Sequence, residues 1–245
     1  MARPPSAAKR HTADDGAETP YERVTLGPIA HGGDTVARLA SGQVVFVTGG
    51  IPGESVTIVR TPEQGGVARG LVDSMMSSSP DRVVPPCSYF GVCGGCQWQH
   101  IDYPAQVALK QRLLTETVQH QTGLATLPIL DPIEAPSPWR YRTAAQFHVT
   151  QEGRLGYLRI RSHESLPIDH CQVCHPLIQE SLRLLQEIVP PAVATTVGAQ
   201  SLREIAVRLA SDERGDSLLL VCYGPPSARP VAERISLSFS ARQLL

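Results

Sequence analysis

Between residues 22 and 73 the chain alternates short apolar, β-branched runs with turn residues. The runs are ERVTL, TVARLA, QVVFVT, ESVTIVR and VARGLVD. Gly, Pro and Ser separate them, and glycines in the segments 30–35 and 51–55 allow the positive φ angles that tight turns need. This pattern predicts a small closed β-barrel of about five strands.

Two later segments have apolar residues at helical spacing. The first covers residues 104–121, with Val107, Leu114 and Val118 on one face and a proline suited to its first turn. The second covers residues 176–189 and is expected to stop before two consecutive prolines. Both segments predict helices.

Two hairpins are predicted over residues 144–160 and 203–224, where alternating segments flank Gly-containing loops. Hairpins and helices together indicate an α+β domain over residues 104–245. A linker and cysteine loop, residues 76–103, precedes this domain. Residues 1–20 mix Pro, Ala, Asp and Thr without apolar periodicity, and we expect a disordered tail there.

Composition and charge narrow the class of protein. The net charge is −1, so any binding of nucleic acid must come from a local basic patch and not from overall charge. No apolar run approaches the roughly 18 residues of a membrane helix, and the N-terminus lacks the apolar core of a secretion signal. We therefore expect a cytoplasmic protein without a membrane partner.

The six cysteines are the main candidates for chemistry, and three of them occur in the segment CSYFGVCGGCQWQH. Disulfides are rare in a reducing cytoplasm. Structural zinc often uses two Cys-x-x-Cys pairs, but here 74 residues separate the pairs Cys93/Cys96 and Cys171/Cys174, and Cys87 would be unused. An iron–sulfur cluster uses three close cysteines and one distant one. The spacing favours a cluster, while zinc and inert core cysteines remain open.

Residues 85–110, PPCSYFGVCGGCQWQHIDYPAQVALK, resemble the cluster-binding signature of bacterial RNA uracil-5-methyltransferases, which form 5-methyluridine in 23S ribosomal RNA. Residues 27–59 resemble the TRAM domain of that family, a small OB-like RNA-binding barrel. The segment WRYRTAAQFHV, followed by GRLGYLRIRSHESLPIDHCQVCHPLI, is similar to its central domain. The resemblance extends from about residue 21 to residue 223 and implies a TRAM barrel over residues 21–75.

The resemblance also implies a cofactor, a four-iron, four-sulfur (4Fe–4S) cluster. Its ligands by position in the motif are Cys87, Cys93, Cys96 and Cys171. Cys174 stands where the family usually has an apolar residue, so we expect a surplus sulfur packed with Val173 and Leu177. Cys222 lies inside an apolar strand pattern and is interpreted as a core residue.

A methyltransferase of this family further needs a Rossmann-like domain for S-adenosylmethionine, a cysteine nucleophile and a general base. No glycine-rich strand-to-helix turn follows Gly224, so we assign no catalytic residue. The predicted fold class is mixed β and α+β: an OB-like TRAM β-barrel, then an α+β central domain with a cysteine-bound cluster, with the Rossmann-like methyltransferase domain absent. A fragmentary gene, a frameshift or a split gene would explain this, and a split gene implies a separately encoded catalytic domain as partner.

The most basic window of the chain, residues 139–163, interleaves arginines with aromatic residues. Guanidinium groups on phosphates and aromatic faces under bases are the means by which single-stranded RNA is held. Phe147 and Tyr157 serve equally well as hairpin core. The candidate RNA-binding residues are Trp139, Arg140, Tyr141, Arg142, Arg154, Arg159 and Arg161.

These features lead to one main hypothesis, the RNA-recognition and iron–sulfur portion of an S-adenosylmethionine-dependent 23S rRNA uracil-5-methyltransferase that does not methylate by itself. Transfer RNA is the alternative substrate. A stand-alone iron–sulfur protein that binds RNA or responds to redox conditions is the alternative from another class.

Overall fold

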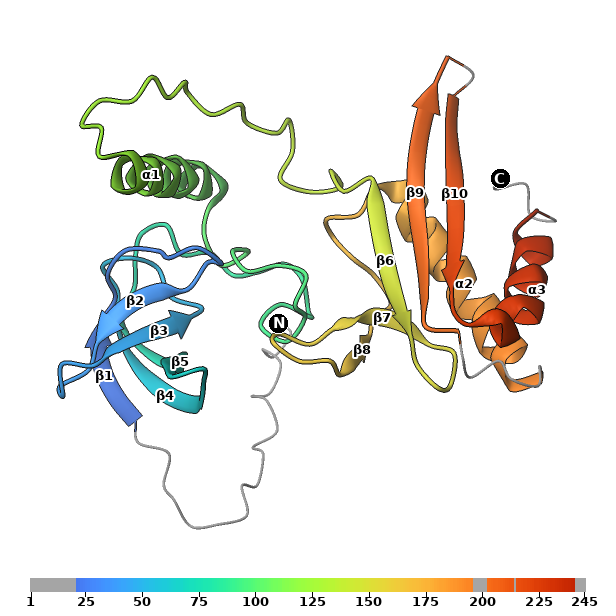
Figure 1. The fold of residues 1–245 in the computed structure, drawn as a ribbon, viewed down its shortest axis with the longest axis horizontal. Coiled ribbons are helices and arrows are strands. Elements are labelled where there is room, and N and C mark those ends of the chain that lie inside the picture. Colours follow the sequence, from blue (N-terminus) through green and yellow to red (C-terminus); the bar gives the residue numbers. More distant parts are fainter. Residues whose placement is uncertain (1–20, 196–201, 214, 241–245) are drawn as a thin grey trace, which may run out of the picture. The chain divides into compact units, whose positions relative to one another are not determined.

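The computed structural model describes residues 21–195, 202–213 and 215–240, and the chain divides into two compact units. The first unit contains residues 21–28 and 34–78, and the second contains residues 29–33 and the chain from residue 79 onward. Each unit has a five-stranded sheet (Figure 1). The tail predicted over residues 1–20 lies outside the described residues.

The sheet of the first unit wraps around one core. Its strands are β1 (Tyr21–Thr25), β2 (Thr35–Arg38), β3 (Val44–Thr48), β4 (Ser55–Gln64) and β5 (Val67–Ser77). They lie in the order β1-β4-β5-β3-β2, and all neighbours are antiparallel except β3 and β5. Val24 on one edge strand and Ala37 on the other belong to the same buried cluster as Val45 and Ile58. The sheet is therefore strongly curved.

The glycines that the sequence marked as turn residues have the expected backbone. Gly32 and Gly33 each have a φ of 95°, and Gly53 has a φ of 88°. The turn at Gly53 is closed by the buried carboxylate of Glu54, which accepts a hydrogen bond from the amide of Ile51 at 2.8 Å. The prediction that these turns need positive φ is confirmed.

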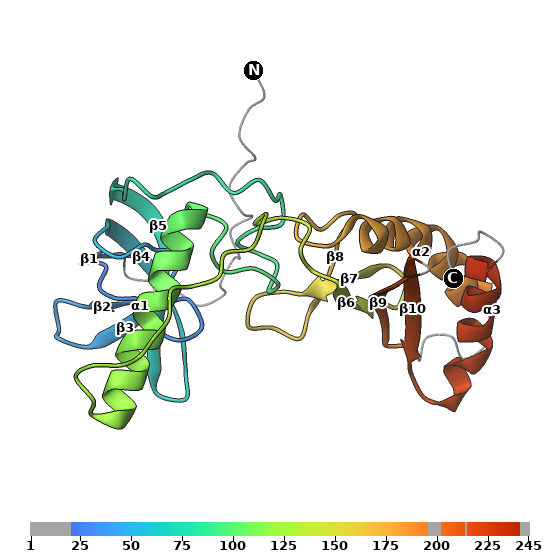
Figure 2. The same ribbon diagram turned by 90° about the horizontal axis from the view of Figure 1, so that it is seen from above.

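The second unit combines an antiparallel sheet with helices. Its strands are β6 (Ala144–Val149), β7 (Leu155–Leu158), β8 (Ser165–Pro167), β9 (Glu204–Asp212) and β10 (Gly215–Tyr223), in the order β10-β9-β6-β7-β8. The helices are α1 (Tyr103–Thr122), α2 (Pro176–Thr195) and α3 (Arg229–Ser240), with a short 3-10 turn over Pro226–Ala228. Helix α2 packs against α3 (Figure 2).

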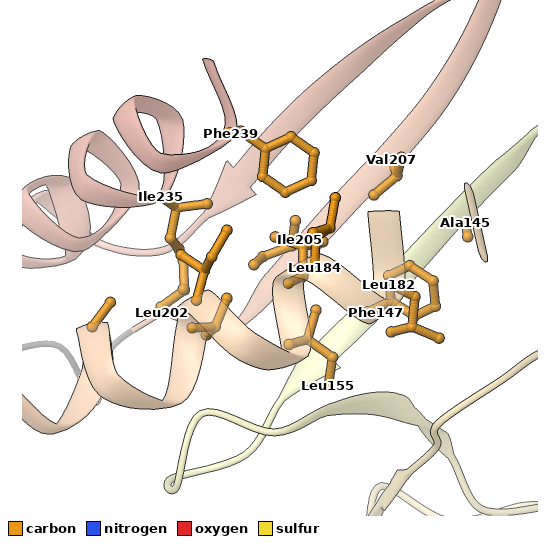
Figure 3. Packing of buried hydrophobic residues seen from close by; sticks show 14 of the residues in the cluster. Ala145, Phe147, Leu155, Leu182, Leu184, Leu202, Ile205, Val207, Ile235 and Phe239 are labelled. Atoms are coloured by element: carbon orange, nitrogen blue, oxygen red, sulfur yellow. The ribbon is translucent and has the colours of Figure 1, made fainter. Parts of the chain in front are cut away.

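The core of this unit lies between the sheet and the helices α2 and α3. Phe147 on β6, Leu182 on α2, Ile205 on β9 and Phe239 on α3 are fully buried in one cluster (Figure 3). Burial of such side chains contributes about 1.5–3 kcal/mol each relative to exposure. Among the described helices, none has the length and apolar character to cross a membrane.

Both predicted helices form, but each departs from its expected pattern. Helix α1 has no buried residue, and Leu114 of its predicted apolar face is 53% exposed. Helix α2 continues through Pro190 and Pro191 to Thr195, where the sequence predicted a stop. Ala192 and Val193 beyond the prolines are buried in the core, and this packing offsets the lost backbone hydrogen bonds.

Candidate functional site

The four predicted cluster cysteines line one cavity within the second unit. These lining residues are Cys87, Cys93, Cys96 and Cys171. Cys174 is not among the lining residues, and at 2% exposure its side chain belongs to the apolar core. Among the described residues, no group of three or more His, Cys, Asp or Glu side chains is placed to hold a metal ion. The cluster and its ligands therefore remain a prediction.

Glycines let the cysteine loop fold closely against strand β7. The amide of Gly94 donates to the carbonyl of Leu158 at 2.9 Å, and a Cβ at Gly94 would stand 3.1 Å from that oxygen. The amide of Gly95 donates to the sulfur of Cys93 at 3.4 Å, and its carbonyl accepts from Nη2 of Arg142 at 3.3 Å. Arg142 thus fixes the loop in addition to carrying charge.

A second tie connects the cysteine loop to the segment that carries Cys171. The hydroxyl of Tyr89 donates to the carboxylate of Asp169 at 3.3 Å and accepts from the Asp169 amide at 3.0 Å. The ring of Tyr89 also contacts that of His170, with the centroids 5.2 Å apart. The three cysteines of the loop and Cys171 are thereby held around one cavity by contacts between protein residues.

Tyr157 brings its hydroxyl to the sulfurs on the other side of the cavity. The hydroxyl lies 3.6 Å from Sγ of Cys174 and 4.0 Å from Sγ of Cys171. Burial raises the pKa of Tyr157, so the phenol stays protonated. Its ring packs against Phe147 with the centroids 5.4 Å apart. Phe147 and Tyr157 therefore belong to the hairpin core, and this alternative to base stacking is confirmed.

The two cysteines of the segment before α2 differ in protonation. A hydrogen bond from Cys174 lowers the pKa of the Cys171 thiol to about 6. The same hydrogen bond, together with burial, raises the pKa of Cys174. Burial also raises the pKa of Cys93 and Cys96. Of these four thiols, Cys171 is the one whose pKa is lowered.

A groove of about 860 Å³ lies beside the cysteine loop, also within the second unit. Aromatic and cationic side chains share its wall: Trp98, Tyr103, Lys110, Trp139, Tyr141 and Arg142. Lys110 Nζ lies 5.9 Å from the ring centroid of Trp98, whose Nε1 donates to the carbonyl of Gly33 at 3.3 Å. Gln99, 9% exposed, lines both the groove and the cysteine cavity.

The structure separates the predicted RNA-binding residues into three groups. Trp139, Tyr141 and Arg142 line the groove. Arg140 and Arg161 are exposed and both have positive φ, at 60° and 51°.

The remaining two arginines of the basic window are ion-paired. Arg154 lies 3.3 Å from the carboxylate of Asp169. The Nε of Arg159 lies 3.1 Å from the carboxylate of Glu164, an ion pair that forms no hydrogen bond at this nitrogen. Their charge is thus partly compensated, which counting charges along the window did not reveal.

Sequence reasoning missed Trp98 and Lys110 as groove residues. Trp98 follows the last loop cysteine by two positions, and Lys110 is one of only two lysines in the chain, the other being Lys9. The segment 98–110 joins the cysteine loop to helix α1. The aromatic and cationic residues of this segment are the feature from which the sequence could have predicted the groove.

The chain is similar to proteins that are named as RNA methyltransferases, although no family profile matches it. An uncharacterized RNA methyltransferase of Gloeobacter violaceus is 35% identical over 68% of this chain and 37% of its own length. The 23S rRNA (uracil(1939)-C(5))-methyltransferase RlmD of Alkalilimnicola ehrlichii is 33% identical over 79% of this chain and 46% of its own length. These relatives are RNA methyltransferases. The chain spans less than half the length of each.

A solved structure has a similar backbone. The tRNA (uracil-54, C5)-methyltransferase of Pyrococcus abyssi, crystallised with S-adenosyl-L-homocysteine, aligns with a TM-score of 0.56 and 18% identity. The alignment covers 86% of this chain and 48% of the other. The similarity shows a shared fold.

This shared fold corrects the fold class predicted from the sequence. The predicted fold class, in which the Rossmann-like methyltransferase domain was absent, is wrong, since 86% of the chain follows the fold of a methyltransferase. The predicted absence relied on where the chain ends. That position carries no such information, because the chain spans only part of the proteins it resembles.

Proposed function

We propose that this chain is part of an S-adenosylmethionine-dependent RNA uracil-C5 methyltransferase, and that its described residues recognise RNA and hold a 4Fe–4S cluster. The observation that carries the proposal is the groove. It combines four aromatic side chains with two cations, in a chain whose relatives are RNA methyltransferases.

The groove suits unpaired RNA because it offers both kinds of contact that single strands use. Stacking of a base on an aromatic ring contributes about 1–3 kcal/mol and tolerates any base. Tyr141 is 55% exposed and Trp139 is half-buried, so their rings are accessible from the groove. Lys110 and Arg142 supply local positive charge to a molecule whose net charge is −1.

The proposed reaction transfers a methyl group from S-adenosylmethionine to C5 of uracil after a nucleophile adds to C6. An enzyme that modifies a base must first take it out of its stack. Under this proposal the described residues grip the nucleotides that flank the target. We assign the nucleophile, the general base and the methyl-donor site to none of them.

Two RNA classes are candidates for the substrate. The relative of Alkalilimnicola ehrlichii carries the name of a 23S rRNA methyltransferase, which supports ribosomal RNA. The structure from Pyrococcus abyssi is named as a tRNA methyltransferase, which supports transfer RNA as the second candidate. We favour 23S rRNA because the sequence similarity to the rRNA enzyme is higher, at 33% against 18%.

The donor set of the cysteine cavity is the one that a 4Fe–4S cluster takes. Four thiols line the cavity, three from the cysteine loop and one from the segment before α2. In a cluster each thiolate binds a different iron. The cluster would join the cysteine loop to the segment before α2.

Binding of single-stranded RNA tests the proposal. Trp139→Ala and Tyr141→Ala should each weaken binding of a 23S rRNA loop fragment by about 5- to 150-fold, the equivalent of 1–3 kcal/mol of stacking. Arg154→Ala is the matched control, because Arg154 is already paired with Asp169. It should change the Kd by less than about twofold. A tRNA fragment measured in parallel distinguishes the two substrate classes.

Lys110→Ala should leave stacking intact but lower the salt dependence, because one fewer phosphate contact releases about one fewer counterion. The measurement is the slope of log Kd against log salt by fluorescence anisotropy. Unchanged affinity in both aromatic variants, together with an unchanged slope for Lys110→Ala, would remove the groove from the proposal.

A further inference from the structure

Cys174 is a sulfur that the proposed function does not use. It lies three residues after Cys171 in a turn, and its amide donates to the Cys171 carbonyl at 3.2 Å. A turn closed in this way brings the first and fourth Cα atoms within about 7 Å. A disulfide needs Cα atoms about 4.4–6.8 Å apart. The backbone is therefore already near the geometry of a Cys171–Cys174 disulfide.

The sulfurs of the two residues also lie at one hydroxyl group. Both sulfurs contact the hydroxyl of Tyr157, at 4.0 Å for Cys171 and 3.6 Å for Cys174. The loop pair Cys93 and Cys96 has the same spacing, but Cys93 accepts from the Gly95 amide and Cys96 interacts with Gln99.

Exposure gives the two cysteines different roles in an oxidation. Cys171 is partly exposed at the cavity, so a small oxidant can reach it. Cys174 is 2% exposed, so it reacts with Cys171 far more readily than with a molecule from solution. This is the arrangement of an attacking thiol with an internal resolving thiol.

We propose that Cys171 and Cys174 form a reversible disulfide by exchange with a low-molecular-weight disulfide such as oxidised glutathione. The Cys171 thiolate attacks one sulfur of glutathione disulfide and releases one glutathione thiolate. Cys174 gives its proton to that leaving thiolate and attacks Cys171, which releases the second glutathione. Two protein thiols are oxidised, and one glutathione disulfide is reduced to two thiols.

One consequence rests on the proposed cluster. A sulfur in a disulfide cannot ligate iron, so the disulfide and the cluster exclude each other at Cys171. The oxidised chain would accept iron only after reduction. The disulfide itself does not depend on the cluster, because all the contacts that carry it are within the protein.

The test uses the full chain, reduced, treated with a chelator and then exposed to oxidised glutathione. Remaining thiols are blocked with a maleimide, and the masses of the tryptic peptides are measured by mass spectrometry. The peptide of residues 162–183 contains Cys171 and Cys174 and no other cysteine. In the wild type it should carry neither maleimide nor glutathione, and should accept two labels after reduction.

Two variants complete the design. In Cys174→Ala the same peptide should keep one glutathione on Cys171, because the resolving thiol is missing. Cys222→Ala, a change on β10, should behave as the wild type. The proposal is overturned if the wild-type peptide keeps glutathione or if both of its thiols react with the maleimide. It is also overturned if the peptide with Cys93 and Cys96 is the one whose thiols fail to react with the maleimide.

Iron uptake separates this inference from the proposed function. Oxidised wild type should take up iron and sulfide only after a reductant is added. In oxidised Cys174→Ala no disulfide can form, so only the glutathione bound to Cys171 should delay the uptake of iron. A chain that forms the disulfide but never binds iron would remove the cluster and leave the disulfide standing.

Discussion

At the scale of single residues, sequence spacing identifies candidates but does not rank them. Cys171 and Cys174 have the spacing of a zinc pair, and burial distinguishes them: one lines the cavity and the other is in the core. Likewise, the charge of Arg154 was readable, but its partner Asp169 lies 15 residues further along the chain. Partners brought together by folding cannot be read from a local window.

The difference between these cysteines yields a prediction about metal. Cys171→Ser should give protein with little iron, because three thiolates hold a 4Fe–4S cluster poorly. Cys174→Ser should keep the brown colour and lose only modest packing stability. Iron and labile sulfide are measured after anaerobic purification of both variants. The reverse result would reassign the fourth ligand, and zinc without sulfide in the wild type would contradict the cluster.

At the scale of elements, periodicity located strands and helices better than it located their ends and faces. The five β-rich runs of the first unit all form strands. Helix α2 extends beyond Pro190 because Ala192 and Val193 pack in the core, a tertiary effect invisible to local rules. Helix α1 has the predicted spacing but no buried residue, because spacing does not specify what a face contacts.

Strand β7 has a position where only glycine fits. A Cβ at Gly156 would lie within van der Waals overlap of the Leu166 carbonyl and 2.7 Å from Cα of Pro167, both on β8. Because the obstructing atoms are backbone, Gly156→Ala should lower the free energy of unfolding by at least about 1–3 kcal/mol. Urea denaturation followed by circular dichroism measures the change. An unaltered midpoint would mean that β8 moves away without cost.

At the scale of the whole chain, the sequence predicted the individual strands and helices better than the fold class. The element pattern was readable, but the fold class was wrong because the chain's end was taken as the end of the protein. The two buried clusters are separate, one in each unit.

Separate cores predict separate responses to mutation. Ile58→Ala in the first unit and Leu182→Ala in the second should each cost about 2–5 kcal/mol, since both side chains are fully buried. Hydrogen exchange with mass spectrometry should show faster exchange only in the unit that carries the change. Faster exchange in both units from either variant would show that they unfold as one.

The hydrogen bonds between Tyr89 and Asp169 have a consequence for the entropy cost of assembly. Between Cys96 and Cys171 the chain makes a loop of 74 residues, and closing a loop of that length costs roughly 4 kcal/mol of entropy. Tyr89 and Asp169 hold the loop closed through protein contacts alone. Under the proposed ligand set, iron would close the same loop, so these hydrogen bonds and the cluster would share the entropy cost of closing it.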